Sequence, residues 1–228
     1  MTDWITLTNK VEPYIVRIIT SAMLGTGWVL GVDNDNGTLA VIIATAYHVI
    51  SGAISLQQTI KIIHSQSGQS KVLHYNERLS AFDINNDLAI LAFDCSDLSA
   101  LPKAKLNFST TSFSTTSSPF EKGTEVGWMG YPGNGLELVS FFQGYISAHL
   151  SALYLIDGNI INGVSGSPVF LESNKDKDPV VIGVILGVTT NNANELGAPL
   201  ARVANIGQYL NLVTRLKSEA QLKQSLEQ

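Results

Sequence analysis

The stretch Gly-Val-Ser-Gly-Ser-Pro at residues 163–168 places one serine on a turn of small residues. Glycine adopts backbone conformations that other residues avoid, so a turn of this kind can aim its N–H groups at a ligand. We therefore interpret Ser165 as a nucleophile. A serine reacts usefully only when a neighbouring base takes its proton and a carboxylate orients that base.

A histidine and an aspartate precede this serine, and each adjoins an apolar run. His48 follows Thr-Ala-Tyr at residues 45–47, and Asp87 opens Leu-Ala-Ile-Leu at residues 88–91. The order along the chain is therefore His, Asp, Ser. This order excludes the α/β-hydrolases, which run Ser, Asp, His, and the subtilisins, which run Asp, His, Ser.

In this order the motifs resemble those of the chymotrypsin-like, or trypsin-like, serine peptidases, and most closely the bacterial HtrA/Deg-type protease domain. The resemblance covers roughly residues 24 to 205. Six segments carry it: residues 25–30, 45–50, 87–91, 123–126, 130–133 and 157–168. One such segment is a weak signal, whereas six in the family's order are a strong one.

The resemblance implies an all-β fold of two six-stranded antiparallel β-barrels with a C-terminal α-helix. Residues 1–108 would form the N-terminal barrel with the histidine and aspartate, and residues 122–228 the C-terminal barrel with the serine and the helix. The Ser/Thr-rich residues 109–121 are predicted to be a linker, with a Thr-rich edge strand as the alternative for 109–118. Short β-rich runs separated by turn residues agree with this fold. Apolar residues at helical spacing near the C-terminus predict the helix, which we expect to pack on the second barrel.

The resemblance also implies a catalytic triad of His48 as general base, Asp87 as its orienting carboxylate and Ser165 as nucleophile. Asp83 competes for the carboxylate role, but the Asp-Leu-Ala-Ile-Leu match at residues 87–91 favours Asp87. The backbone N–H groups of Gly163 and Ser165 would form the oxyanion hole that stabilises the tetrahedral intermediate. The implied activity is that of a serine endopeptidase, which cleaves protein or peptide substrates through an acyl-enzyme intermediate.

Five residues are implied to bind the substrate. Asn159 and Ile160 would lie at the base and wall of the primary side-chain pocket, and Leu186, Gly187 and Val188 would form the edge to which an extended substrate adds as a strand. No carboxylate stands at position 159 to compensate a buried Lys or Arg side chain. We therefore expect cleavage after small or medium apolar residues.

Three departures from the family pattern bear on activation, on the geometry of the serine loop and on substrate recruitment. Val164 stands where Asp or Asn usually precedes the nucleophile, so the trypsin-type activation switch cannot operate. Ser167 replaces a usual glycine, and no PDZ domain follows the protease motifs. The alternative function is thus a protease-fold binding or regulatory module, catalytically silent or activated by a protein partner. The complete triad favours the enzyme, because binding alone does not require all three groups.

The composition is that of a globular protein. Of 228 residues, 45% are hydrophobic and 14% are charged, which supplies substantial cores and excludes extensive disorder. The net charge is −5 and the basic residues are scattered, so we expect no nucleic-acid partner. We see no signal peptide, and no apolar run is long enough to cross a bilayer; we expect a cytoplasmic protein without a membrane partner.

Cysteine and histidine usage argues against cross-links and cofactors. Cys95 is the single cysteine, so no intrachain disulfide can form. His64, His74 and His149 lack the spacing of a zinc site, and we expect neither a metal ion nor another cofactor.

Overall fold

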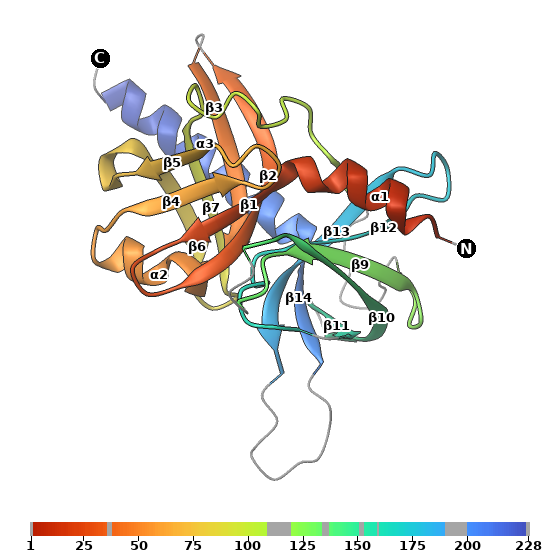
Figure 1. Cartoon of the computed structure of the whole chain (residues 1–228). Coiled ribbons are helices and arrows are strands. Elements are labelled where there is room, and N and C mark those ends of the chain that lie inside the picture. Colours follow the sequence, from red (N-terminus) through yellow and green to blue (C-terminus); the bar gives the residue numbers. More distant parts are fainter. Residues whose placement is uncertain are drawn as a thin grey trace.

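The computed structural model of the chain describes residues 2–35, 38–108, 120–133, 137–150, 153–158, 160–189 and 200–226. Strands dominate, and they form two sheets that lie side by side (Figure 1). The first sheet has the strand order β5-β4-β1-β2-β3-β7-β6. Its strands are β1 (Ile15–Ile19), β2 (Leu24–Asp35), β3 (Thr38–Ala46), β4 (Ile60–His64), β5 (Ser70–Leu73), β6 (Leu79–Asp83) and β7 (Leu88–Asp94).

Every pair of neighbours in the first sheet is antiparallel. Over the described residues, no pairing joins β5 to β6, so this sheet curls into a half-barrel without closing. Buried and more exposed side chains alternate along β4, where the first, third and fifth residues are buried: Ile60 and Ile62 are apolar, and the third of these is the polar His64.

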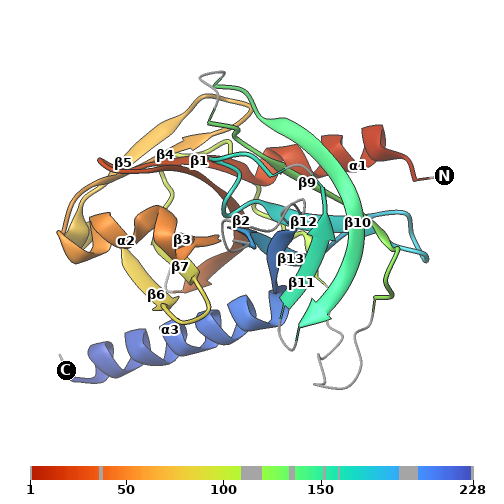
Figure 2. The ribbon, with the colours of Figure 1, turned by 90° about the horizontal axis from the view of Figure 1, so that it is seen from below.

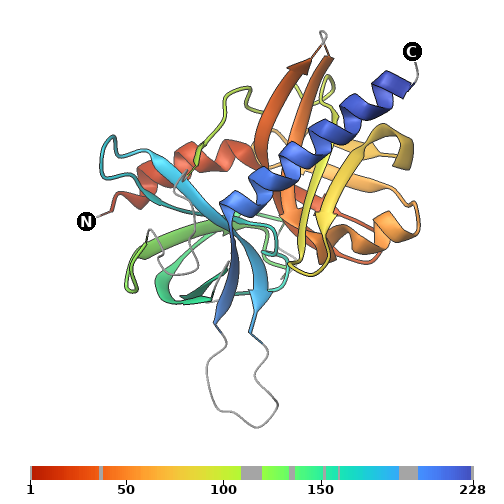
Figure 3. The same ribbon diagram turned by 180° about the vertical axis from the view of Figure 1, so that it is seen from behind.

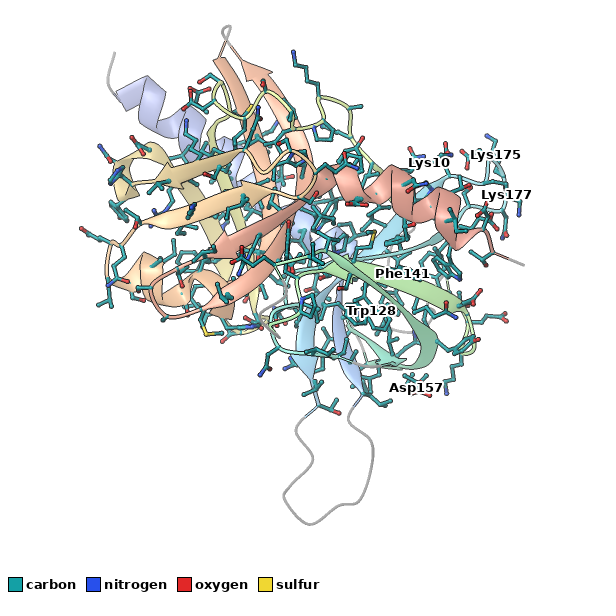
Figure 4. All side chains as sticks on the ribbon, in the orientation of Figure 1. Lys10, Trp128, Phe141, Asp157, Lys175 and Lys177 are labelled. Carbon is teal, nitrogen blue, oxygen red and sulfur yellow. The ribbon has the colours of Figure 1, made fainter. Side chains whose placement is uncertain are left out.

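The second sheet has the order β12-β9-β10-β11-β14-β13-β8, and an additional pairing of β12 with β13 closes six of its strands into a barrel. Trp128, which is labelled in Figure 4, is fully buried in this barrel. Its ring stacks on that of Phe142. The short strand β8 adds to the outside of the barrel, parallel to β13. The strands are β8 (Asn107–Phe108), β9 (Glu125–Gly130), β10 (Ser140–Leu150), β11 (Leu153–Asp157), β12 (Pro168–Glu172), β13 (Pro179–Val188) and β14 (Ala201–Asn205).

Three α-helices and two 3-10 turns complete the described fold. They are α1 (Trp4–Val11), η1 (Glu12–Tyr14), α2 (Tyr47–Ser55), η2 (Tyr75–Glu77) and α3 (Ile206–Leu226). The Asp3 side chain caps the start of α1 by accepting a hydrogen bond from the Thr6 N–H. The Trp4 ring then contacts Phe141 and Phe170, with ring centroids 5.2 and 6.0 Å away, and α1 packs on β9 and β13, so it covers part of the second sheet.

The C-terminal helix corrects one expectation from the sequence. We expected α3 to pack on the second barrel, and it does contact β13 and β14 there, but it also crosses the strands β6 and β7 of the first sheet (Figures 2 and 3). Tyr209, Leu212 and Leu216 are buried on this face, and the Arg215 guanidinium donates a hydrogen bond of 2.9 Å to the Phe82 carbonyl. The helix thus ties the two halves of the molecule together.

The predicted all-β, chymotrypsin-like fold with a C-terminal helix is confirmed. For the N-terminal half we expected a closed six-stranded barrel, and the structure has an open, curled sheet there. Residues 109–119, which include most of the predicted linker, lie outside the described residues, and the predicted domain boundaries stay a prediction. No helix in the described parts of the chain has the length and apolar character needed to cross a membrane.

Candidate active site

His48 and Asp87 are joined by two hydrogen bonds. The Asp87 carboxylate lies 2.7 Å from His48 Nδ1 through Oδ2, and it accepts the backbone N–H of His48 at 2.8 Å through Oδ1. The Asp87 carbonyl also accepts the N–H of Tyr47 at 3.0 Å. Asp87 has φ of +59°, a left-handed conformation that aspartate tolerates better than most residues. The turn before β7 is therefore fixed to the first turn of α2.

This geometry sets the tautomer of the histidine. An ionised carboxylate only accepts hydrogen bonds, so the Nδ1 of His48 carries the proton and Nε2 of the neutral ring presents a lone pair. The His48 side chain is 37% exposed, whereas that of Asp87 is 23% exposed. The ring can thus reach a substrate while the carboxylate behind it is partly shielded.

Asp83 makes different contacts. Its carboxylate accepts the N–H groups of Asn85 and Asn86 at 3.0 and 3.2 Å, and the Asn86 side-chain amide at 2.7 Å. These hydrogen bonds, the Asn86 side-chain amide first, lower the pKa of Asp83. Asp83 therefore stabilises the loop that leads to Asp87, and among the described residues it is Asp87 that contacts His48.

The turn with Ser165 lies against the strands that lead to His48. The Ser165 carbonyl accepts the N–H of Thr26 in β2 at 2.9 Å. Gly166 has φ of +91°, and a β-carbon on it would lie 1.9 Å from the Thr26 carbonyl oxygen and 2.5 Å from Thr45 Oγ1. Since Thr45 is three residues from His48, the predicted nucleophile and base share one region. Within the described residues, however, no hydrogen bond joins the Ser165 hydroxyl to the His48 ring; such bonds are often long in unliganded enzymes.

The predicted oxyanion-hole donors are the N–H groups of Gly163 and Ser165. Gly163 has φ of +95°, a conformation that glycine adopts without strain. The preceding peptide is fixed because the Asn162 carbonyl accepts the N–H of Gly133 at 2.5 Å. Neither predicted donor is bonded to another of the described residues, which leaves both for a ligand oxygen.

The C-terminal helix contributes Tyr209 to the back of this region. Its side chain is fully buried, and its hydroxyl donates a hydrogen bond of 2.9 Å to the Thr45 carbonyl. Burial, followed by the nearby Asp87 carboxylate, raises the pKa of Tyr209 well above its ordinary value, so the hydroxyl stays a donor. The helix thereby supports the strand end that precedes His48.

The five predicted substrate-binding residues fall into two groups. Asn159 lies outside the described residues, and Ile160 is partly buried against the core of the second barrel. Leu186, Gly187 and Val188 end β13, where Gly187 and Val188 pair with β14. On the other edge of β13, pairing with β12 ends at Val184, so the edge at Leu186–Val188 has no strand partner among the described residues.

Residues 25–184 match the model of the trypsin-like peptidase domain, which is most of the chain. The chain belongs to this family. It is a serine endopeptidase by class, as the sequence motifs predicted. The peptidase family implies protein substrates. None of the curated proteins matches this chain in sequence.

Solved structures show the same fold. Deg5 is 22% identical over 93% of this peptidase and 92% of its own chain, with a TM-score of 0.64. An inactive form of Rv3671c from M. tuberculosis is 19% identical over 96% of this peptidase and 95% of its own chain, with a TM-score of 0.62. The active form of Rv3671c protease reaches a TM-score of 0.61 at 19% identity over 92% and 83% of the two chains. The likeness to HtrA/Deg-type proteases expected from the motifs is confirmed at the level of fold.

Sequence reasoning missed two residues that the structure places beside the site, Thr26 and Tyr209. Thr26 falls within the matching segment at residues 25–30, where a polar side chain between Gly25 and Gly27 was a usable signal. Tyr209 falls on the apolar face of α3 and differs from its neighbours only by its hydroxyl. Among the described residues no group of three or more metal-binding side chains occurs.

Proposed function

We propose that this peptidase cleaves proteins through an acyl-enzyme on Ser165, with His48 as general base and Asp87 as the carboxylate that orients it. Ser165 Oγ attacks the scissile carbonyl carbon while its proton passes to His48 Nε2. The oxyanion that forms is stabilised by the N–H groups of Gly163 and Ser165. His48 then donates the proton to the leaving amine as the C–N bond breaks, and water hydrolyses the ester by the same steps.

One observation carries this proposal: His48 Nδ1 lies 2.7 Å from Asp87 Oδ2, and the Ser165 turn is bonded to β2 of the same sheet through the N–H of Thr26. The pair leaves Nε2 as the free nitrogen of the ring, which is the atom that must face a nucleophile. The unpaired edge of β13 at Leu186–Val188 supports binding of an extended substrate beside this centre by main-chain hydrogen bonds.

Labelling with a fluorophosphonate probe tests the proposal. The purified peptidase, without any partner, should react at Ser165, because the probe requires an activated serine and an accessible oxyanion hole. Mass spectrometry of the digested adduct locates the modified residue. A label on another residue would contradict the assignment of the nucleophile. Absence of any label would favour the alternative, a silent or partner-activated module, which predicts labelling only after a protein partner is added.

For specificity, we propose a preference for small or medium apolar residues such as Ala, Val or Leu before the scissile bond. Ile160 packs against the barrel core and narrows the expected pocket, and no carboxylate stands at position 159. A buried Lys or Arg without a charged partner would cost on the order of several kcal/mol, which peptide binding hardly offsets. A peptide-library cleavage profile measures this preference, and a profile dominated by Lys or Arg would contradict it.

A further inference from the structure

Gly163 lies between two peptide groups that are each held by one hydrogen bond. The carbonyl before it, from Asn162, accepts the N–H of Gly133 at 2.5 Å. Its own carbonyl accepts the hydroxyl of Thr26 at 2.9 Å. The first bond holds the peptide that contains the Gly163 N–H, and the second holds the peptide that follows. Because glycine otherwise has the widest choice of backbone angles, the two bonds together fix the backbone of Gly163 and with it the direction of its N–H.

The Thr26 hydroxyl can donate its proton to only one acceptor. Its oxygen already accepts the N–H of Tyr131 at 2.9 Å, so its single proton is directed at the Gly163 carbonyl. Thr26 is fully buried, and a hydroxyl that lost this acceptor would find no water to replace it. The hydrogen bond is thus fixed in direction as well as in distance.

The rest of the turn lacks the ionic anchor of a trypsin-like activation switch. Val164 stands where Asp or Asn is usual, and its side chain is fully buried in the core of the second barrel. An apolar contact of this kind fixes the depth of the turn without fixing the direction of a peptide group. The direction of the peptide groups at Gly163 is therefore fixed by their hydrogen bonds.

From this geometry we infer that Thr26 is a positioning residue for the oxyanion hole: its hydroxyl holds the Gly163–Val164 peptide and thereby fixes the backbone angles of Gly163, so that the Gly163 N–H faces the substrate carbonyl. The inference rests on the proposed function, in which Gly163 donates to the oxyanion. It assigns to a residue of the first sheet the role of ordering a loop of the second. The loop is then ordered before any substrate or partner arrives.

The test compares Thr26→Val, which keeps the shape and removes the hydroxyl, with Thr26→Ser, which keeps the hydroxyl. Losing a whole oxyanion donor costs about 10²–10³ in kcat, so a donor that is merely misdirected in Thr26→Val should lower kcat by about 10- to 100-fold. KM should change by no more than about two-fold, because the oxyanion exists only after attack. Thr26→Ser should restore most of kcat.

Ser167→Ala is the matched control. The Ser167 hydroxyl is also buried and makes no hydrogen bond to the described residues, and a β-carbon on Gly130 would lie 2.0 Å from it and 2.7 Å from Thr26 Oγ1. The Ser167 hydroxyl thus lies near the Thr26 hydroxyl, beside Gly130, but does not bond to the Gly163 carbonyl. Its removal should leave both kcat and KM within about two-fold of the wild type, since no bond is lost.

A second measurement does not depend on turnover. In glycine-labelled protein, the amide resonance of Gly163 should shift or broaden in Thr26→Val and return in Thr26→Ser, while the resonance of Gly68, in an exposed turn far along the chain, stays unchanged. Absence of probe labelling in the wild type would overturn the proposed function, whereas an unchanged Gly163 amide in Thr26→Val would overturn the role of Thr26. A wild-type kcat in Thr26→Val, or a loss confined to KM, would overturn it as well. If Thr26→Val does not fold, Thr26→Ala carries the same comparison with less crowding.

Discussion

Replacing Ser165 with alanine is expected to lower kcat by about 10⁶-fold, the scale of loss seen when the nucleophile of a Ser-His-Asp hydrolase is removed. The reason is that Ser165 is the proposed nucleophile, and among the described residues no other serine and no cysteine bonds to the His48 ring. The residual rate should stay about 10³–10⁴ above that in water, because binding and the oxyanion hole remain. Single-turnover hydrolysis of a fluorogenic peptide measures the change, and fluorophosphonate labelling should disappear with it.

The same substitution should leave the free energy of unfolding within about 0.5 kcal/mol of the wild type. The Ser165 side chain is half-buried and its hydroxyl bonds to none of the described residues, while its carbonyl keeps the bond to Thr26. Thermal denaturation supplies this control. Peptide cleavage by Ser165→Ala at more than a small fraction of the wild-type rate would show that another residue is the nucleophile.

The sequence was sufficient for most strands because their apolar runs are long and are bounded by turn residues. The β-rich runs at residues 88–93 and 168–172 each predict a strand, and the structure has β7 and β12 there. The sequence does not predict strands β5 and β6, because they have only four and five residues and mix polar with apolar side chains, so their periodicity is weak. Pairing with β4 and β7 stabilises them, and such pairing is not visible in a local pattern.

The helices show the same limit. Helix α1 has only eight residues, and its docking depends on Trp4 meeting Phe141 and Phe170 of the second barrel, far along the chain. The apolar stripe of α3 predicted a helix, but a stripe says nothing about which of two apolar surfaces it will cover. In the structure α3 crosses β6 and β7, while the hydroxyl of its buried Tyr209 donates to the Thr45 carbonyl in β3.

For the candidate site, motif order directed attention to His48, Asp87 and Ser165, whereas the residues that support them could not be found in this way. The bond from Thr26 to Gly163 joins positions 137 residues apart. Only the packing of one sheet against the other brings them together. Local sequence patterns therefore indicated the reacting groups, while the network that orders them is a property of the tertiary structure.

Asp87→Asn is expected to lower kcat by about 10⁴-fold. This is the loss typical of a Ser-His-Asp triad whose aspartate is replaced by asparagine, because the histidine then adopts the wrong tautomer. The introduced side-chain amide would keep the acceptor for the His48 N–H but would present its NH₂ group to Nδ1. Nδ1 must then accept, so Nε2 carries the proton and cannot take one from Ser165. Steady-state kinetics on the same peptide measure the loss, and the fold should be retained because the shape is unchanged.

Asp83→Asn is the matched comparison, since it makes the same chemical change four residues earlier. The Asp83 carboxylate accepts backbone N–H groups of Asn85 and Asn86, and an asparagine oxygen can still accept them. Its kcat should therefore stay within about three-fold of the wild type, a change of under about 1 kcal/mol in the barrier. If Asp83→Asn lost activity strongly while Asp87→Asn did not, the orienting carboxylate would be Asp83. The His48–Asp87 bond would then be a structural contact that ties α2 to the turn before β7.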